Sequence, residues 1–87
     1  MNKKWLDSAW EECEERSMYD KKFKKKLIEL IKDIERHPFS GIGKPEPLKG
    51  NMSGWWSRHI NDTDRLVYRV NEGDIEILEC IGHYDDK

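Results

Sequence analysis

The 87-residue sequence has only two cysteines, Cys13 and Cys80, and no long hydrophobic run. Two cysteines are too few for the disulfide framework of a small secreted domain, and their spacing matches no metal-binding motif. We therefore expect both to be buried apolar residues of a cytoplasmic protein. No membrane-spanning helix is expected, since this needs about 20 consecutive apolar residues. Lys3 and Lys4 lead straight into an amphipathic pattern, which argues against a signal peptide.

Hydrophobic residues are also few. They make up 36% of the sequence against 39% charged residues, and the mean hydropathy is −0.99. The length allows one domain, residues 1–87, with no room for a linker or a second core. A domain of this size buries only about two-thirds of its unfolded surface. We therefore expect the four tryptophans to supply much of the buried area, and dimerisation could add more.

Positive charge is unevenly distributed along the chain, although the net charge is only −2. Residues 20–60 carry ten basic and five acidic groups, whereas the two flanking segments together carry six basic and thirteen acidic groups. The net charge argues against nucleic acid, but binding depends on the local field, and a positive band can still face phosphate. Lys21, Lys22 and Lys25 belong to the densest part of this band. A solvated helix face has the same pattern, and this reading stays open.

Hydrophobic periodicity predicts two helices in the first half of the chain. A first helix, capped by Asp7 or Ser8, is expected to end near Tyr19. A second helix is expected over residues 20–37, because Pro38 disfavours helix at the residue before it. Its apolar residues recur at steps of three and four and define one buried face. These residues are Phe23, Leu27, Leu30, Ile31 and Ile34.

Strand-like runs make up most of the second half. Three of them follow a loop rich in glycine and proline, namely Trp55–Ile60, Arg65–Val70 and Ile75–Ile81. Their short connections predict an antiparallel meander, and residues 2–6 read as a further short strand. The predicted fold class is α+β, with two N-terminal helices packed on one face of an antiparallel sheet.

One carboxylate, Glu46, lies between Pro45 and Pro47 in the loop. Each proline fixes its own φ and favours an extended conformation in the residue before it, so Lys44 and Glu46 lose conformational freedom. Neither proline has an N–H, and we expect the loop not to join the sheet as a regular strand. A rigid mount suits a general base, which must be held within hydrogen-bond reach of its proton. The alternative is a stiff connector with a solvated glutamate.

Arg65 begins a predicted strand. Strand alternation places it on one face with Val67 and Arg69. If the helices cover the other, more apolar face, Arg65 lies on the open one, where its guanidinium suits a phosphate. The alternative is an ion pair with Asp62 or Asp64.

Two histidines are further candidates. His83 follows the last strand beside Tyr84 and has an ordinary pKa near 6.5, so it can act as an acid at neutral pH. A histidine near a chain end is also commonly just exposed. His59 lies in a strand beside Arg58 and could face either the core or a ligand.

Together, these residue types are the set needed to cleave RNA without a metal. A glutamate can take the proton of a 2′-hydroxyl, which then attacks the neighbouring phosphate, while arginine and lysine balance the charge on the phosphoryl oxygens. A histidine can protonate the departing 5′-oxygen, and a tyrosine can stack on a base or orient the phosphate. The sequence offers no metal-ligand cluster and no phosphate-cradling glycine loop, so we expect no metal and no cofactor.

Four motifs occur in a definite order: GKPEPLK at residues 43–49, SGWWSR at 53–58, DRLVY at 64–68 and HY at 83–84. In order and spacing they resemble the YoeB toxins of the RelE superfamily, and the resemblance runs from about residue 5 to residue 84. It implies a microbial-ribonuclease fold, usually as a homodimer. It also implies a ribosome-dependent endoribonuclease that cuts mRNA in the decoding site, and a YefM-like antitoxin whose disordered C-terminal segment folds across the site.

The resemblance also implies roles for single residues. The catalytic set is Glu46 as the base, Arg65 on the phosphate, His83 as the acid, and Tyr84. The set expected to bind RNA or its phosphates is Lys44, Lys49, Arg58 and His59. Lys21, Lys22 and Lys25 become candidate contacts with ribosomal RNA. His59 departs from the family, since relatives often have a second arginine there. The rival readings are a non-catalytic RNA- or ribosome-binding module and a protein-interaction domain.

Overall fold

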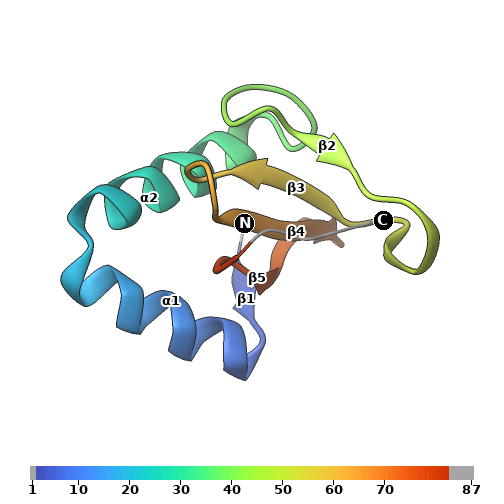
Figure 1. Ribbon diagram of the computed structural model, residues 1–87. Coiled ribbons are helices and arrows are strands. Elements are labelled where there is room, and N and C mark those ends of the chain that lie inside the picture. The colour runs from blue at the N-terminus through green and yellow to red at the C-terminus, as the bar shows by residue number, and fades with distance from the viewer. Residues whose placement is uncertain (1, 83–87) are drawn as a thin grey trace.

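The computed structural model describes residues 2–82. Two helices lie together on one side of a five-stranded sheet (Figure 1). In chain order the elements are β1 (Lys3–Trp5), α1 (Asp7–Tyr19), α2 (Lys21–Arg36), β2 (Glu46–Pro47), a 3₁₀ turn (Gly50–Met52), β3 (Trp56–His59), β4 (Arg65–Asn71) and β5 (Asp74–Glu79). The predicted α+β class, with two N-terminal helices on a sheet, is confirmed.

The sheet is larger than the predicted meander. Its strand order is β1-β5-β4-β3-β2, with antiparallel pairing everywhere except between β1 and β5, which are parallel. The edge strand β2 pairs Glu46 with Ser57 and Pro47 with Trp56. The expectation that the prolines keep this loop off the sheet is therefore wrong. An edge strand tolerates proline, because its missing N–H can face away from the sheet.

The two helices begin differently. At α2 the Asp20 side chain accepts a hydrogen bond from the Phe23 N–H at 3.0 Å, and all five predicted apolar positions of this helix are buried. At α1 the capping position is Leu6, which makes no side-chain bond, so the predicted cap by Asp7 or Ser8 is wrong. Neither described helix is long and apolar enough to cross a membrane.

The core lies between the helices and the sheet and contains buried apolar side chains from α1, α2, β4 and β5. Trp5 and Trp56 pack against it while remaining half-buried. Trp10 is 48% exposed, and Trp55 lies against Arg69, whose guanidinium carbon is 4.5 Å from the ring centre. The tryptophans therefore contribute less of the core than the sequence predicted.

Cys13 of α1 and Cys80, just after β5, are both buried, as predicted. The structure joins them in a disulfide, with 6.1 Å between their Cα atoms. The expectation that they serve only as apolar core residues is wrong on this point. The sequence could not predict this pairing, because the two cysteines are 67 residues apart and only the fold brings α1 against the end of β5.

Candidate functional site

The face of the sheet opposite the helices, here called the open face, gathers several predicted site residues. Strand pairing places Glu46 opposite Ser57, and His59 opposite Arg65. Successive residues of a strand alternate between the two faces. Because Leu66 belongs to the core under the helices, its neighbour Arg65 lies on the open face, as predicted. Glu46, His59 and Arg65 therefore share this face.

The charges on the open face act on His59. Its side chain is half-buried, and burial, followed by the positive charges of Arg65 and Lys44, lowers its pKa. Glu46 and Asp62 act in the opposite direction without reversing the shift. His59 is therefore neutral at pH 7. Arg65 is also half-buried and forms no ion pair within the described chain, so the alternative of a bond to a neighbouring aspartate is not found there.

A strained turn lies just before β2. Gly43 and Lys44 both have left-handed backbones, with φ of 81° and 53°. A Cβ at Gly43 would lie 2.6 Å from Leu30 Cδ2, so only glycine fits. The His59 N–H donates to the Gly43 carbonyl at 2.7 Å and holds the turn against β3. The expected extended conformation of Lys44 is therefore wrong, and strain of this kind recurs at functional sites. Glu46 follows two residues later.

Arg58 does not lie on the open face. Its side chain is 0% exposed and points towards the helices, so the prediction that it binds RNA phosphates is wrong. An arginine has five N–H donors, and all five are used here at 2.5 to 3.1 Å. The acceptors are Tyr68 Oη, Asp33 Oδ2 and the backbone carbonyls of His37, Ser40 and Ile42. No donor remains for a substrate.

The Arg58 cluster, made of Arg58, Asp33 and Tyr68, ties the end of α2 to the sheet. Asp33 Oδ2 also accepts from the Ile42 N–H at 3.1 Å, and Tyr68 Oη donates to the Pro38 carbonyl at 2.7 Å. The hydrogen bond from Arg58 is the main reason that the pKa of Asp33 is lowered. The cluster fixes the turn that leads into β2, and the sequence did not reveal it.

Two predicted catalytic residues, His83 and Tyr84, lie outside the described residues. The chain that leads to them is anchored by buried Asp64, whose carboxylate accepts from the Gly82 N–H at 2.8 Å and from Arg16 at 2.9 Å. Burial disfavours the charge of Asp64, but its hydrogen bonds outweigh this and lower its pKa. Asp64 therefore links α1 to the segment just before the predicted acid.

The basic residues fall into two separate places. Lys21, Lys22 and Lys25 are exposed at the start of α2, whereas β2 lies beyond the other end of that helix (Figure 1). A helix of 16 residues is about 24 Å long, so these lysines are not brought together with the open face. Lys44 and Lys49 are exposed on either side of β2.

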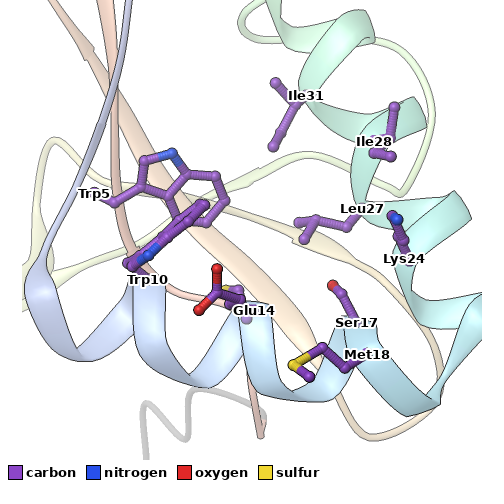
Figure 2. A pocket seen from close by; sticks show the side chains of 10 residues that line it. Trp5, Trp10, Glu14, Ser17, Met18, Lys24, Leu27, Ile28 and Ile31 are labelled. Carbon is purple, nitrogen blue, oxygen red and sulfur yellow. The ribbon is translucent and has the colours of Figure 1, made fainter.

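An apolar hollow of about 370 Å³ lies between α1 and α2, on the helix side of the sheet (Figure 2). Trp5 and Trp10 form one wall, with their rings in edge contact and the centres 5.5 Å apart. None of the predicted site residues lines it. Across residues 2–82, no three His, Cys, Asp or Glu side chains are grouped so that they could hold a metal ion. The predicted site residues that come together do so on the open face.

Known proteins resemble this chain over nearly its whole length. Residues 5–84 match a family model described as a YoeB-like toxin of bacterial type II toxin-antitoxin systems. Toxin YoeB of Synechocystis sp. is 50% identical over 80 residues, which cover 92% of this chain and 87% of the relative. A solved YoeB/ParE toxin from Agrobacterium tumefaciens is 41% identical with a TM-score of 0.93, covering 97% of this chain and 100% of its own.

Two structures from Staphylococcus aureus are also similar. A YoeB-YefM complex has a TM-score of 0.90 at 42% identity, and a YoeB dimer has a TM-score of 0.89 at 44% identity. Each match covers 97% of this chain and 98% of the other. With the five-stranded sheet, the two helices and the motifs between residues 43 and 68 in place, the chain belongs to the YoeB-like toxins of bacterial type II toxin-antitoxin systems.

Proposed function

We propose that this toxin is a ribosome-dependent endoribonuclease that cleaves mRNA in the decoding site and thereby inhibits translation. The observation that supports this most directly is the strand register that brings Glu46, His59 and Arg65 onto one open face. A carboxylate that can accept a proton and a permanently charged guanidinium are the two groups that attack by a 2′-hydroxyl requires.

In the proposed reaction, Glu46 takes the proton of the 2′-hydroxyl, and the oxygen forms a bond to the adjacent phosphorus. Arg65 balances the negative charge that builds on the phosphoryl oxygens, and Lys44 and Lys49 assist it. The proposed route uses no metal and no cofactor. Arg58 has no part in it, because its donors are occupied in the core.

The leaving group needs an acid. As the bond from phosphorus to the 5′-oxygen breaks, His83 donates its proton to that oxygen, and Tyr84 stacks on a base beside the break. The products are a 2′,3′-cyclic phosphate on one fragment and a free 5′-hydroxyl on the other. Asp64 supports this step, since it holds the backbone of Gly82 immediately before the acid.

The proposed partners are the ribosome, an antitoxin and a second copy of the toxin. Lys21, Lys22 and Lys25 form a separate exposed basic surface that can contact ribosomal RNA while the open face holds mRNA. The Staphylococcus aureus relatives were solved as a YoeB-YefM complex and as a YoeB dimer. We infer a YefM-like antitoxin and a homodimer for this chain as well, in the cytoplasm.

Primer extension on an mRNA, with and without ribosomes and with and without the protein, tests this function. We expect cuts only when ribosomes are present, with a 5′-hydroxyl on the downstream fragment. A 5′-phosphate would contradict the mechanism, because it requires attack by water instead of the 2′-hydroxyl. The Glu46→Ala variant separates the rival readings: it should still bind ribosomes but fail to cut. Ribosome binding by the wild type without any cut would favour a non-catalytic binding module.

A further inference from the structure

Ser57 lies buried on the open face, in the strand next to the edge strand β2. It pairs with Glu46 on one side and with Val67 on the other, two positions along β3 from His59. Its side chain is 1% exposed, and its Oγ atom has no hydrogen-bond partner among the described residues. Within residues 2–82 it is the only buried side-chain nitrogen or oxygen of which this is true.

The other buried polar side chains are fully engaged. Arg58 donates five hydrogen bonds, and the Asp64 carboxylate accepts three. A buried hydroxyl without a partner costs free energy, and native proteins keep few such groups. An unpaired hydroxyl on the face of a proposed catalytic site therefore indicates a partner that it meets in the working state.

Glu46 is the polar group best placed to be that partner. Side chains directly opposite each other on antiparallel strands have Cβ atoms about 4.5–5.5 Å apart, a distance that a glutamate can span by folding back over its neighbour. The Glu46 side chain is exposed, and its residue lies directly opposite Ser57 in the pairing of β2 with β3. Val67, on the other side of Ser57, has no polar atom in its side chain. A hydroxyl can donate and a carboxylate can only accept, so the two groups are complementary.

We propose that Ser57 is a positioning residue whose hydroxyl donates a hydrogen bond to the Glu46 carboxylate and holds it over β3 when RNA occupies the open face. This inference rests on the proposed function, because it assigns the residue that positions the proposed general base, Glu46. The bond acts in two ways. It keeps the carboxylate where it can take the 2′-hydroxyl proton, and it favours the charged form, which is the form a base needs. Ser57 itself touches neither the RNA nor the reacting atoms.

The test is the Ser57→Ala variant, measured as single-turnover cleavage of mRNA on ribosomes across a range of pH. We expect the rate to fall about tenfold, the effect of losing one hydrogen bond to a charged group. The acid limb of the pH–rate profile should move to higher pH, since the carboxylate then protonates more readily. The free energy of unfolding should stay the same or rise, because the variant removes a buried hydroxyl that has no partner in the folded protein.

Ser53→Ala, at an exposed loop serine, is the matched control and should change neither rate, acid limb nor stability. An unchanged rate in Ser57→Ala would overturn the proposal. So would a raised KM with an unchanged acid limb, because Ser57 would then contact the substrate directly. A less stable variant would mean that the hydroxyl supports the fold.

A second measurement is independent of RNA cleavage. NMR titration of the Glu46 carboxylate with an uncleavable 2′-deoxy oligonucleotide bound should give a midpoint at higher pH in Ser57→Ala than in the wild type. Equal midpoints would overturn the inference even if the toxin cuts RNA. A shifted midpoint in a protein that cuts no RNA would uphold the Ser57–Glu46 bond and contradict the proposed function alone.

Discussion

Asp33 and Arg58 form an ion pair beneath the open face, with 2.6 Å between Asp33 Oδ2 and Arg58 Nη1. The same guanidinium donates to three backbone carbonyls of the turn that follows α2. That turn continues into β2, so the pair fixes the path of the chain towards Glu46. Arg58 therefore belongs to the frame of the site, whereas Arg65 lies on the face where a substrate can meet it.

Arg58→Ala is expected to lower the free energy of unfolding by about 3–5 kcal/mol, as when a buried ion pair loses one partner. Lysine should not restore it, because an ammonium cannot reproduce the planar fork of five donors. Guanidinium denaturation followed by tryptophan fluorescence measures the change. Arg65→Ala is the matched control and should lie within about 0.5 kcal/mol of the wild type. If the Arg58→Ala protein were as stable as the wild type but bound RNA less well, the prediction that Arg58 binds RNA phosphates would be correct after all.

Glu46→Ala and Arg65→Ala should each reduce cleavage at least roughly 10²-fold, as expected for a positioned base and a charge-stabilising group. Neither change should alter the fold, because Glu46 is exposed and Arg65 makes no ion pair within the described chain. Single-turnover cleavage on ribosomes gives the rates, and circular dichroism checks the fold. If both variants cut at the wild-type rate, the open face is not the catalytic site.

The sequence was sufficient to predict which face of the sheet Arg65 lies on, but not which face Arg58 lies on. The alternation in β4 predicted the face of Arg65 correctly, because Leu66 and Tyr68 make the opposite face plainly apolar. In β3 both sets of alternate residues mix polar and aromatic side chains. The face of Arg58 therefore depends on the register between β3 and β4, in which Arg58 lies opposite the core residue Leu66.

The sequence pattern also could not predict the path of the segment before Glu46. Local preferences predict an extended Lys44 before proline, but the N–H of His59 at the edge of β3 takes the Gly43 carbonyl as its acceptor. This contact between distant residues accompanies the left-handed φ at Gly43 and Lys44. By contrast, the spacing of apolar residues in α2 was sufficient to predict its buried face, since periodicity within one helix needs no distant partner.

Acid should destabilise the fold through Asp33 and Asp64. The bond from Arg58 lowers the pKa of Asp33 from its ordinary 3.8, and hydrogen bonds outweigh burial to lower the pKa of Asp64. A carboxyl with a lower pKa in the folded than in the unfolded protein stabilises the fold above the unfolded pKa. This contribution is lost as the pH falls through the folded pKa. The free energy of unfolding should therefore fall steadily below about pH 4.

Denaturation curves at several pH values between about 3 and 7 measure this loss. Asp33→Asn should be less stable than the wild type at neutral pH, and the difference should shrink on acidification, because the amide has no charge to lose. A constant difference between the two proteins over this range would show that the charge of Asp33 does not contribute to the pH dependence.

The Cys13–Cys80 disulfide should add to stability only under oxidising conditions. Closing a loop of this length stabilises a protein by about 4 kcal/mol in the chain-entropy model. Dithiothreitol should therefore lower the melting temperature of the wild type, but not that of the double variant Cys13→Ala, Cys80→Ala. Because the proposed cytoplasmic location would keep the thiols reduced, the reduced protein should still fold and cut RNA. Identical melting curves with and without the reductant would mean that the pair is a packed pair of thiols.

His59 is expected to make RNA binding depend on pH. Burial and the charges of Arg65 and Lys44 lower its pKa below the ordinary 6.5, against the smaller opposing effects of Glu46 and Asp62. The imidazole therefore carries its positive charge only in acid, and at neutral pH it adds none to the open face. His59→Arg would supply that charge at every pH. The variant should lower the KM for mRNA on ribosomes several-fold at about pH 7.5, the effect of one charge-assisted contact to phosphate.

The advantage of His59→Arg should shrink as the pH falls through the lowered pKa of His59, because the wild-type imidazole then gains its own proton. His59→Gln is the matched control, because it keeps a polar side chain but never becomes charged. It should equal the wild type at about pH 7.5 and bind RNA more weakly than the wild type in acid. Steady-state cleavage across this pH range gives the KM of each protein. If the glutamine variant showed the pH dependence of the wild type, another group would be responsible for the stronger RNA binding in acid. His59 would then not contact the RNA.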